Sequence, residues 1–164
     1  LRICLSGFQY AGWLSVLYGN QVLPIVAALI AVHLLLHSSP KIELVVLVSC
    51  TLLGMVVDTS LTRTGVFVFT QDHAWPPLWL ALLWLSFSAT LRQVLRWFKG
   101  RYLLFALVGS SAGAASYLAA GRLGAVSFGI AEIEAALLLA LIWMMLFPAL
   151  MKLASAMEDQ RVLA

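Results

Sequence analysis

The stretch from Asp72 to Trp97, DHAWPPLWLALLWLSFSATLRQVLRW, most constrains what this chain can fold into. A polar turn and a Trp-Pro-Pro sequence precede about twenty mostly apolar residues, and Arg92, Arg96 and Trp97 close the stretch. A membrane-spanning helix has this order of parts, because an aromatic anchor lies at one interface, apolar side chains fill the lipid, and cations lie at the other interface. We therefore predict a membrane span over roughly residues 76–98.

The composition extends this prediction to the whole chain. Of its 164 residues, 63% are hydrophobic and only 10% are charged, and the mean hydropathy is +1.00. Soluble domains average nearer half apolar and a quarter charged, so lipid must be the solvent for most of this chain. At roughly 20 residues a span, the length allows about six helices with short connections and leaves no room for a soluble domain.

Prolines, glycines and polar turns divide the chain into six apolar segments. We predict an all-α integral membrane bundle, a single transmembrane domain over residues 1–164, with spans at roughly 3–19, 22–38, 42–61, 76–98, 102–120 and 129–153. The first segment has no small-residue cleavage site of the A-x-A kind, so we expect it to be retained as a span. In the fifth segment, Gly109 and Gly113 have the small-xxx-small spacing that allows a close helix approach.

The one long connection, roughly 62–75, is apolar and aromatic in its middle but too short to span a membrane. Non-helical backbone at membrane depth is tolerated only when protein buries it. We therefore expect this connection to lie in the interface or to dip back into the bundle.

The cations predict the orientation, because positive residues favour cytoplasmic loops. One side of a six-span bundle carries eight Lys and Arg residues, and the other side carries only Arg63 and Arg122. Both termini are therefore predicted to be cytoplasmic, which is the N-in/C-in arrangement. The eight cations are Arg2, Lys41, Arg92, Arg96, Lys99, Arg101, Lys152 and Arg161.

The cluster at Arg92, Arg96, Lys99 and Arg101 has two interpretations. Topology and contact with anionic lipid explain it, and a phosphate-binding site for a lipid or nucleotide is the alternative. The formal net charge of +3 is interpreted as loop bias. No basic run is interleaved with exposed aromatic residues, so nucleic acid is excluded as a partner.

Ionisable groups within a bilayer cost several kcal/mol and usually face the bundle interior, which makes them candidate functional groups. Asp58 lies about 24 Å along its helix, inside the hydrocarbon and near the outer face. It could join an outward-facing polar pocket, either a proton- or metal-assisted site or a site for a polar headgroup. The structural alternative pairs Asp58 with Arg63 or Arg122 and leaves two Glu at a helix N-terminus. Candidate catalytic residues are Asp58, His73, Glu132 and Glu134, and candidate ligand-binding residues are Asp58, Arg63, Asp72, His73 and Arg122.

His33 and His37 form the second polar feature and are the candidate metal ligands. Their i, i+4 spacing places both on one face of a helix, with His33 about 16 Å deep. Membrane desaturases and hydroxylases need many more histidines, and only His73 remains. A single metal held with a carboxylate from another helix, or a haem with one axial His, is compatible with the pair. The alternative is two hydrogen-bonded histidines that join neighbouring helices.

Four segments of the chain together suggest a family. They are FQYAGWLSVLYGN at Phe8–Asn20, LLGMVVDTSLTRTGVF at Leu52–Phe67, PPLWLALLWLSFSATL at Pro76–Leu91 and SYLAAGRLGAV at Ser116–Val126. In this order they resemble one bacterial family of small multipass inner-membrane proteins, catalogued as domain of unknown function 2878. The resemblance covers nearly the whole chain and implies a bacterial inner membrane and a connection with lipid. It transfers no active-site motif.

Three classes of function follow from these features. The leading one is a membrane protein that binds a lipid-like ligand or a partner membrane subunit, because the fifth segment is rich in small residues and no complete catalytic set is present. The second is a membrane-embedded lipid-modifying enzyme that uses the outer carboxylates and His73, or else His33 and His37 on the inner side. The third is a small proton-coupled transporter with a water path to Asp58. Membrane lipids are the expected partners. A second copy of the chain or a partner membrane subunit is a further candidate partner. The sequence specifies no cofactor.

Overall fold

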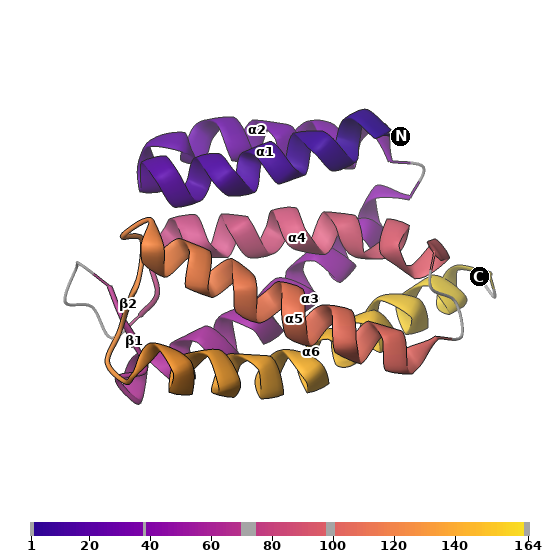
Figure 1. Ribbon diagram of the computed structural model, residues 1–164. Coiled ribbons are helices and arrows are strands. Elements are labelled where there is room, and N and C mark those ends of the chain that lie inside the picture. The colour runs from indigo at the N-terminus through magenta and orange to yellow at the C-terminus, as the bar shows by residue number, and fades with distance from the viewer. Residues whose placement is uncertain (1, 38, 70–74, 98–100, 163–164) are drawn as a thin grey trace.

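The computed structural model describes residues 2–37, 39–69, 75–97 and 101–162. Most of these residues lie in six α-helices, and the predicted all-α class is confirmed (Figure 1). Each helix falls on one of the six predicted apolar segments. The helices are α1 (Arg2–Tyr18), α2 (Leu23–Leu36), α3 (Pro40–Arg63), α4 (Leu78–Trp97), α5 (Tyr102–Arg122) and α6 (Glu132–Val162); a 3-10 turn η1 (Gly19–Val22) and strands β1 (Phe67–Val68) and β2 (Ser127–Phe128) complete the fold.

Several helices are long and apolar enough to cross a membrane. Three stretches of the described residues meet this condition: Tyr10–Leu36, Pro40–Arg63 and Glu132–Ala156. The first of them contains the turn η1, and Figure 1 shows α1 and α2 side by side with opposite directions. Helix α4 adds a shorter apolar core over Leu78–Leu91. These helices make the chain a membrane protein.

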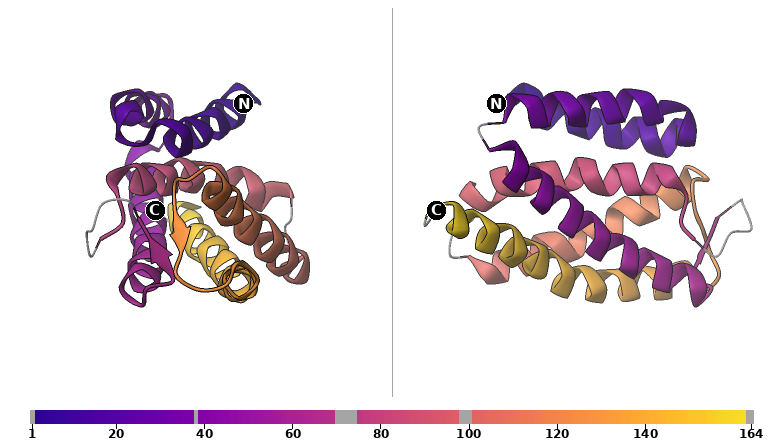
Figure 2. Two further views of the ribbon diagram at one scale, coloured as in Figure 1. Left: turned by 60° about the vertical axis from the view of Figure 1, so that its left-hand side comes forward. Right: turned by 180° about the vertical axis from the view of Figure 1, so that it is seen from behind.

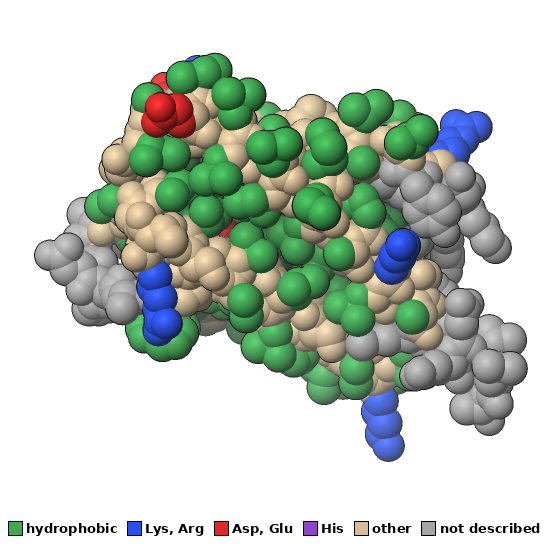
Figure 3. All heavy atoms as spheres, turned by 90° about the horizontal axis from the view of Figure 1, so that it is seen from below, with side chains coloured by type: hydrophobic (Ala, Val, Ile, Leu, Met, Phe, Trp, Pro, Cys, Tyr) green, Lys and Arg blue, Asp and Glu red, His purple; other side chains and the backbone are tan. Residues whose placement is uncertain are grey.

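The outside of the bundle is apolar, as a lipid-facing surface requires. Leu35, Leu103 and Met145 are 83%, 84% and 79% exposed. On the face that Figure 3 shows, hydrophobic side chains cover most of the middle, and the Lys and Arg side chains project toward the periphery. Exposed apolar patches of this extent are rare on soluble monomers.

Helix α4 is the central element of the bundle. It contacts α1, α2, α3 and α6, while α5 packs along α6. Figure 2 shows the α1–α2 hairpin as a layer on one side of α4, with α3, α5 and α6 on the other side. The larger hydrophobic core therefore lies among α3, α4, α5 and α6. A smaller cluster beneath the hairpin includes Val26, Ile30 and Leu47.

The glycines of α5 allow a close approach, as their spacing predicts, but rings rather than backbone fill the space. A Cβ at Gly113 would overlap the Trp143 indole of α6, and a Cβ at Gly109 would overlap the Phe147 ring. The small residues of α5 are thus recesses for the aromatic side chains of α6.

Two stacked indoles join four helices at the centre of the core. Trp84 of α4 and Trp143 of α6 lie parallel, with ring centroids 5.5 Å apart and planes at 5°. The Trp84 ring also covers Gly54 of α3, where a Cβ would overlap it. Offset stacking of aromatic rings stabilises beyond the burial of their area, by about 0.5–1.5 kcal/mol. The order Gly54, Trp84, Trp143, Gly113 is therefore a continuous packed row across the bundle.

The long connection packs onto one end of the bundle as far as it is described. Val66, Phe67 and Phe69 are buried, and the Phe67 ring stacks on Tyr117 of α5 at 5.1 Å. Strands β1 and β2 pair antiparallel, with Phe67 opposite Phe128. A Cβ at Gly129 would overlap the Gly65 carbonyl, so the two backbones meet only because this residue is glycine.

Candidate functional site

Asp58 is held by side chains from two other helices. It is 1% exposed. Trp84 Nε1 of α4 donates a hydrogen bond to its Oδ2 at 2.6 Å. The Tyr117 hydroxyl of α5 donates to Oδ1 at 2.8 Å and to Oδ2 at 2.9 Å. The carboxyl group therefore joins α3, α4 and α5, and a buried polar group must have such partners to be tolerated.

Local packing explains why these donors reach Asp58. Gly54 lies one helical turn before Asp58 on the same face of α3. Because Gly54 has no side chain, the Trp84 ring can lie against the α3 backbone, and its Nε1 then meets the carboxylate. Stacking on Phe67 positions the Tyr117 ring from the other side.

A cavity of about 520 Å³ lies beside this carboxylate. Its walls come mainly from α1, α4, α5 and α6, and the described residues that line it are aromatic, aliphatic or small. Trp84 and Tyr117 line the cavity, but Asp58 does not. The two donors thus separate the carboxylate from the cavity. Other wall residues are Trp13, Trp79, Phe87, Ala112, Trp143 and Phe147.

Three Ser or Thr residues line this mostly apolar wall where it is described: Thr90, Ser116 and Ser86. Ser86 is 2% exposed. Its hydroxyl has no hydrogen-bond partner among the described residues. Buried hydroxyl groups are usually paired, so this atom is available to a ligand.

The predicted outer pocket is only partly assembled in the described residues. Arg122 Nη2 contacts Glu132 Oε1 at 3.2 Å, and both side chains are largely exposed. Glu134 accepts a hydrogen bond from the backbone N–H of Ala131 at 3.3 Å, at the start of α6. Neither of these carboxylates is among the described partners of Asp58, which are Trp84 and Tyr117. Asp72 and His73 lie outside the described residues.

The Arg63 guanidinium lies over the Trp75 ring, 4.7 Å from its centroid. Pairing of Asp58 with Arg63 or Arg122 was the structural alternative for the buried carboxylate. Among the described residues the partners of Asp58 are instead Trp84 and Tyr117.

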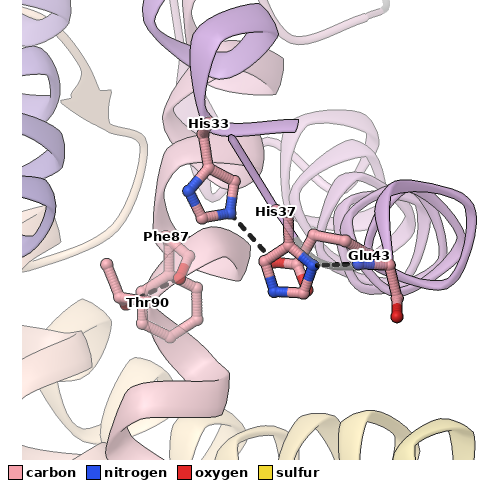
Figure 4. Close-up of polar contacts among 6 residues, drawn as sticks. His33, His37, Glu43, Phe87 and Thr90 are labelled. Carbon is pink, nitrogen blue, oxygen red and sulfur yellow. Dashed lines mark hydrogen bonds and ion pairs between the residues drawn. The ribbon is translucent and has the colours of Figure 1, made fainter. Parts of the chain in front are cut away.

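His33 and His37 come together with a third residue, Glu43 of α3 (Figure 4). His33 Nε2 lies 3.0 Å from Glu43 Oε1, and His37 Nε2 lies 3.5 Å from Glu43 Oε2. The Ser39 backbone N–H donates to His37 Nδ1, so a neutral His37 carries its proton on Nε2 and directs it toward Glu43. The expected interhelical hydrogen bonding of these histidines is therefore present.

No group of three or more His, Cys, Asp or Glu is arranged to hold a metal ion within residues 2–37, 39–69, 75–97 and 101–162. The two imidazoles meet a carboxylate that is 1% exposed. The described contacts at this cluster are hydrogen bonds and ion pairs between α2 and α3.

Comparison with known protein families shows to which family the chain belongs. The family described as “Protein of unknown function (DUF2878)” matches residues 2–149. The chain belongs to this family. The resemblance carried by the four sequence segments is thereby confirmed. No curated protein and no solved structure matches the chain.

In this family member, three residues at the two buried sites were not predicted. Glu43 had a signal in the sequence: the connection between α2 and α3 is short, so residues at similar distances from the turn lie level with each other. His33 and Glu43 are nearly equidistant from it. Trp84 and Tyr117 had no such signal, because they lie 26 and 59 residues from Asp58.

Proposed function

We propose that this protein crosses a bacterial inner membrane six times, with both termini in the cytoplasm, and holds the apolar chain of a lipid-like ligand. The cavity among α1, α4, α5 and α6 carries this proposal. Its volume of about 520 Å³ falls within the range of about 300–1,000 Å³ that is usual for small-molecule sites. Aromatic and aliphatic side chains form most of the wall and suit an alkyl chain, because they offer dispersion contacts and few polar groups to desolvate.

The arrangement of the helices supports six spans. Figure 1 shows successive helices running in alternating directions, with the N and C labels at the same end of the molecule. Lys41 lies in the first turn of α3 and Arg101 precedes α5, whereas Arg63 and Arg122 end α3 and α5. Lys41 and Arg101 therefore belong to the end that carries both termini. This agrees with a cytoplasmic location of that end, because cytoplasmic loops carry an excess of cations.

The two other classes of function have less support. A lipid-modifying enzyme would need the outer carboxylates for catalysis. Glu132 instead pairs with Arg122 on the surface, and Glu134 accepts a hydrogen bond at the start of α6. For a proton-coupled transporter, Asp58 is separated from the cavity by the Trp84 and Tyr117 rings. A partner membrane subunit is the remaining alternative occupant.

Native mass spectrometry in mild detergent tests the proposal with two matched variants of α5. Ala112 lines the cavity, whereas Ala115 is exposed but is not among the wall residues. We expect a bound lipid on the wild-type protein, loss of it in Ala112→Phe, and retention in Ala115→Phe. A bare protein in every case, a partner subunit in place of lipid, or equal loss from both variants would refute the proposal.

A further inference from the structure

The cavity reaches the surface of the bundle between α1 and α5. The residues of α4 and α6 that line it are buried or half-buried, whereas every exposed residue of its described wall belongs to α1 or to α5 and its C-cap. The cavity therefore has a floor on α4 and α6 and an opening along α1 and α5, which we call the α1–α5 slit. The exposed wall residues that define the slit are Trp13, Val108, Ala112, Ser116 and Leu123.

Helix packing explains why the opening lies there. Helix α1 packs on α2 and α4, and α5 packs along α6. Extensive packing between α1 and α5 is absent from the described residues, and Figure 1 shows α4 between these two helices. Gly12 of α1 lines the cavity, and a Cβ added to it would meet nothing within 4 Å. The two helices are therefore the two edges of an open slit.

The slit is long and narrow. On α5 and its C-cap it runs from Val108 to Leu123, fifteen residues along the chain (108 to 123), or about 22 Å along the axis. Its narrowness follows from the floor, because Trp84, Trp143 and Phe147 stay buried behind it. A helix with its side chains is about 10–12 Å across and cannot enter such an opening. A flexible hydrocarbon chain can, so the shape favours a chain over the helix of a partner subunit.

A charged headgroup remains outside this cavity. The described wall contains no charged residue, and burial of an unpaired charge in apolar surroundings is strongly unfavourable. Phe69 and Val126, from the connections that follow α3 and α5, line the cavity and are buried. These connections therefore cover the outer end of the cavity. The slit is left as the way by which a chain inside stays joined to a headgroup outside.

These observations point to the source of the ligand. Resting on the proposed function, we propose that the cavity takes one acyl chain of an intact bilayer lipid, which enters sideways through the α1–α5 slit while the headgroup and the second chain remain in the membrane. The slit is long enough to face the hydrocarbon, which is about 30 Å thick. The volume of about 520 Å³ is that of a site for a drug-sized molecule, which one chain fills and a whole two-chain lipid exceeds.

Photocrosslinking in a bilayer tests this route. The full chain is reconstituted in nanodiscs that contain one of two probes with the same diazirine-bearing acyl chain, either a two-chain phosphatidylcholine or the free fatty acid. Light converts the diazirine into a carbene, which inserts into nearby O–H and C–H bonds, and peptide mass spectrometry locates the label. Ser86 and Phe147 report the cavity, because both line it and are buried. Leu103 and Met145, 84% and 79% exposed, report lipid on the outside of the bundle.

Two neighbouring residues of α5 supply matched variants. Ser116 belongs to the slit, whereas Ala115 is exposed but is not among the wall residues. In the wild-type protein we expect both probes to label Ser86 and Phe147. Ser116→Phe should lose this label with both probes, because the new ring blocks the slit, and Ala115→Phe should keep it. Label on the outside of the bundle should be the same in all three proteins, which shows that each is inserted in the bilayer.

The outcomes separate the inference from the proposed function. Cavity label from the free fatty acid alone would overturn the inference and leave the proposed function intact, because a detached single chain would then be the ligand. Cavity label that survives Ser116→Phe, or is lost equally in Ala115→Phe, would overturn the slit as the entrance. Absence of cavity label with both probes would remove the proposed function together with the inference. If Ser116→Phe does not fold, the comparison of the two probes on the wild-type protein decides.

Discussion

Glu43 and Asp58 are two buried carboxyl groups on one helix, and their surroundings differ in kind. They are separated by fifteen residues of α3 (43 to 58), or about 22 Å along the axis. Each is 1% exposed. Glu43 faces two imidazoles, which can carry a proton and balance its charge. Asp58 faces an indole N–H and a phenol, which cannot.

The difference separates a structural contact from a candidate site. A carboxylate beside imidazoles can be neutralised within the protein, and its partners tie α2 to α3. A carboxyl group held only by neutral donors has no partner that could balance its charge, and here both donors line a cavity. Four tests probe this contrast, from the strongest expected effect to the weakest.

The largest effect is expected at Gly54. In Gly54→Ala the new Cβ overlaps the Trp84 ring, so the indole must leave its stack with Trp143 and its bond to Asp58. We expect a loss of roughly 3 kcal/mol in the free energy of unfolding, measured as the unfolding midpoint in detergent. Gly12→Ala is the control, because a Cβ there meets nothing within 4 Å. Equal midpoints for the two variants would contradict the packed row.

The second test removes each carboxylate in turn. Asp58→Ala leaves the buried Trp84 N–H and Tyr117 O–H without an acceptor, which should cost about 2–4 kcal/mol. Glu43→Ala should cost less, about 1–2 kcal/mol. The His33 and His37 side chains are 15% and 22% exposed, so each can find another hydrogen-bond partner outside the bundle. The same unfolding midpoint reports both variants. If Glu43→Ala proves the more destabilising, the contrast between the two sites is reversed.

A smaller effect separates the two histidines. His33 Nε2 is 3.0 Å from the Glu43 carboxylate, and His37 Nε2 is 3.5 Å from it. We expect His33→Ala to destabilise by about 1 kcal/mol and His37→Ala by less, because hydrogen bonds weaken with distance. Chemical denaturation in mixed micelles can resolve this difference. A greater loss in His37→Ala would show that the shorter contact is not the stronger one.

The weakest effect is expected on the surface. Arg122 and Glu132 form an ion pair whose side chains are 78% and 59% exposed. Exposed pairs contribute about 0–1 kcal/mol, so Arg122→Ala should leave the unfolding midpoint nearly unchanged. The double variant Arg122→Ala with Glu132→Ala completes a thermodynamic cycle. A coupling well above 1 kcal/mol would mean that this pair belongs to a larger polar site.

The helices were predictable because their cause is local. A run of apolar residues bounded by Pro40 or by Trp75-Pro76-Pro77 must satisfy its own backbone in lipid, and a helix does this within the segment. Asp58 was also predictable as a buried polar group, because an ionisable side chain within a span usually faces the bundle interior. Its partners depend on how α4 and α5 are rotated against α3. That rotation depends on which rings pack against Gly54 and Gly113, and this is decided only in the folded bundle.

The β1–β2 ladder shows the same limit at a smaller scale. Two residues on each strand give no periodic pattern, and their pairing joins Phe67 to Phe128, which is far away in the sequence, at one end of the bundle. Glu43 was different, because the short α2–α3 connection already placed it level with His33. Contacts near a tight turn can be predicted from residue spacing, and contacts between distant helices cannot.

The parallel indoles of Trp84 and Trp143 also give the protein an optical signature. Aromatic rings fixed in an asymmetric packing produce near-ultraviolet circular dichroism, which disappears when tertiary packing loosens while helices persist. Rings with centroids 5.5 Å apart and planes at 5° should couple strongly and dominate that signal. Because α3, α4, α5 and α6 all meet at this row, one spectral band follows the closure of the whole core without any label.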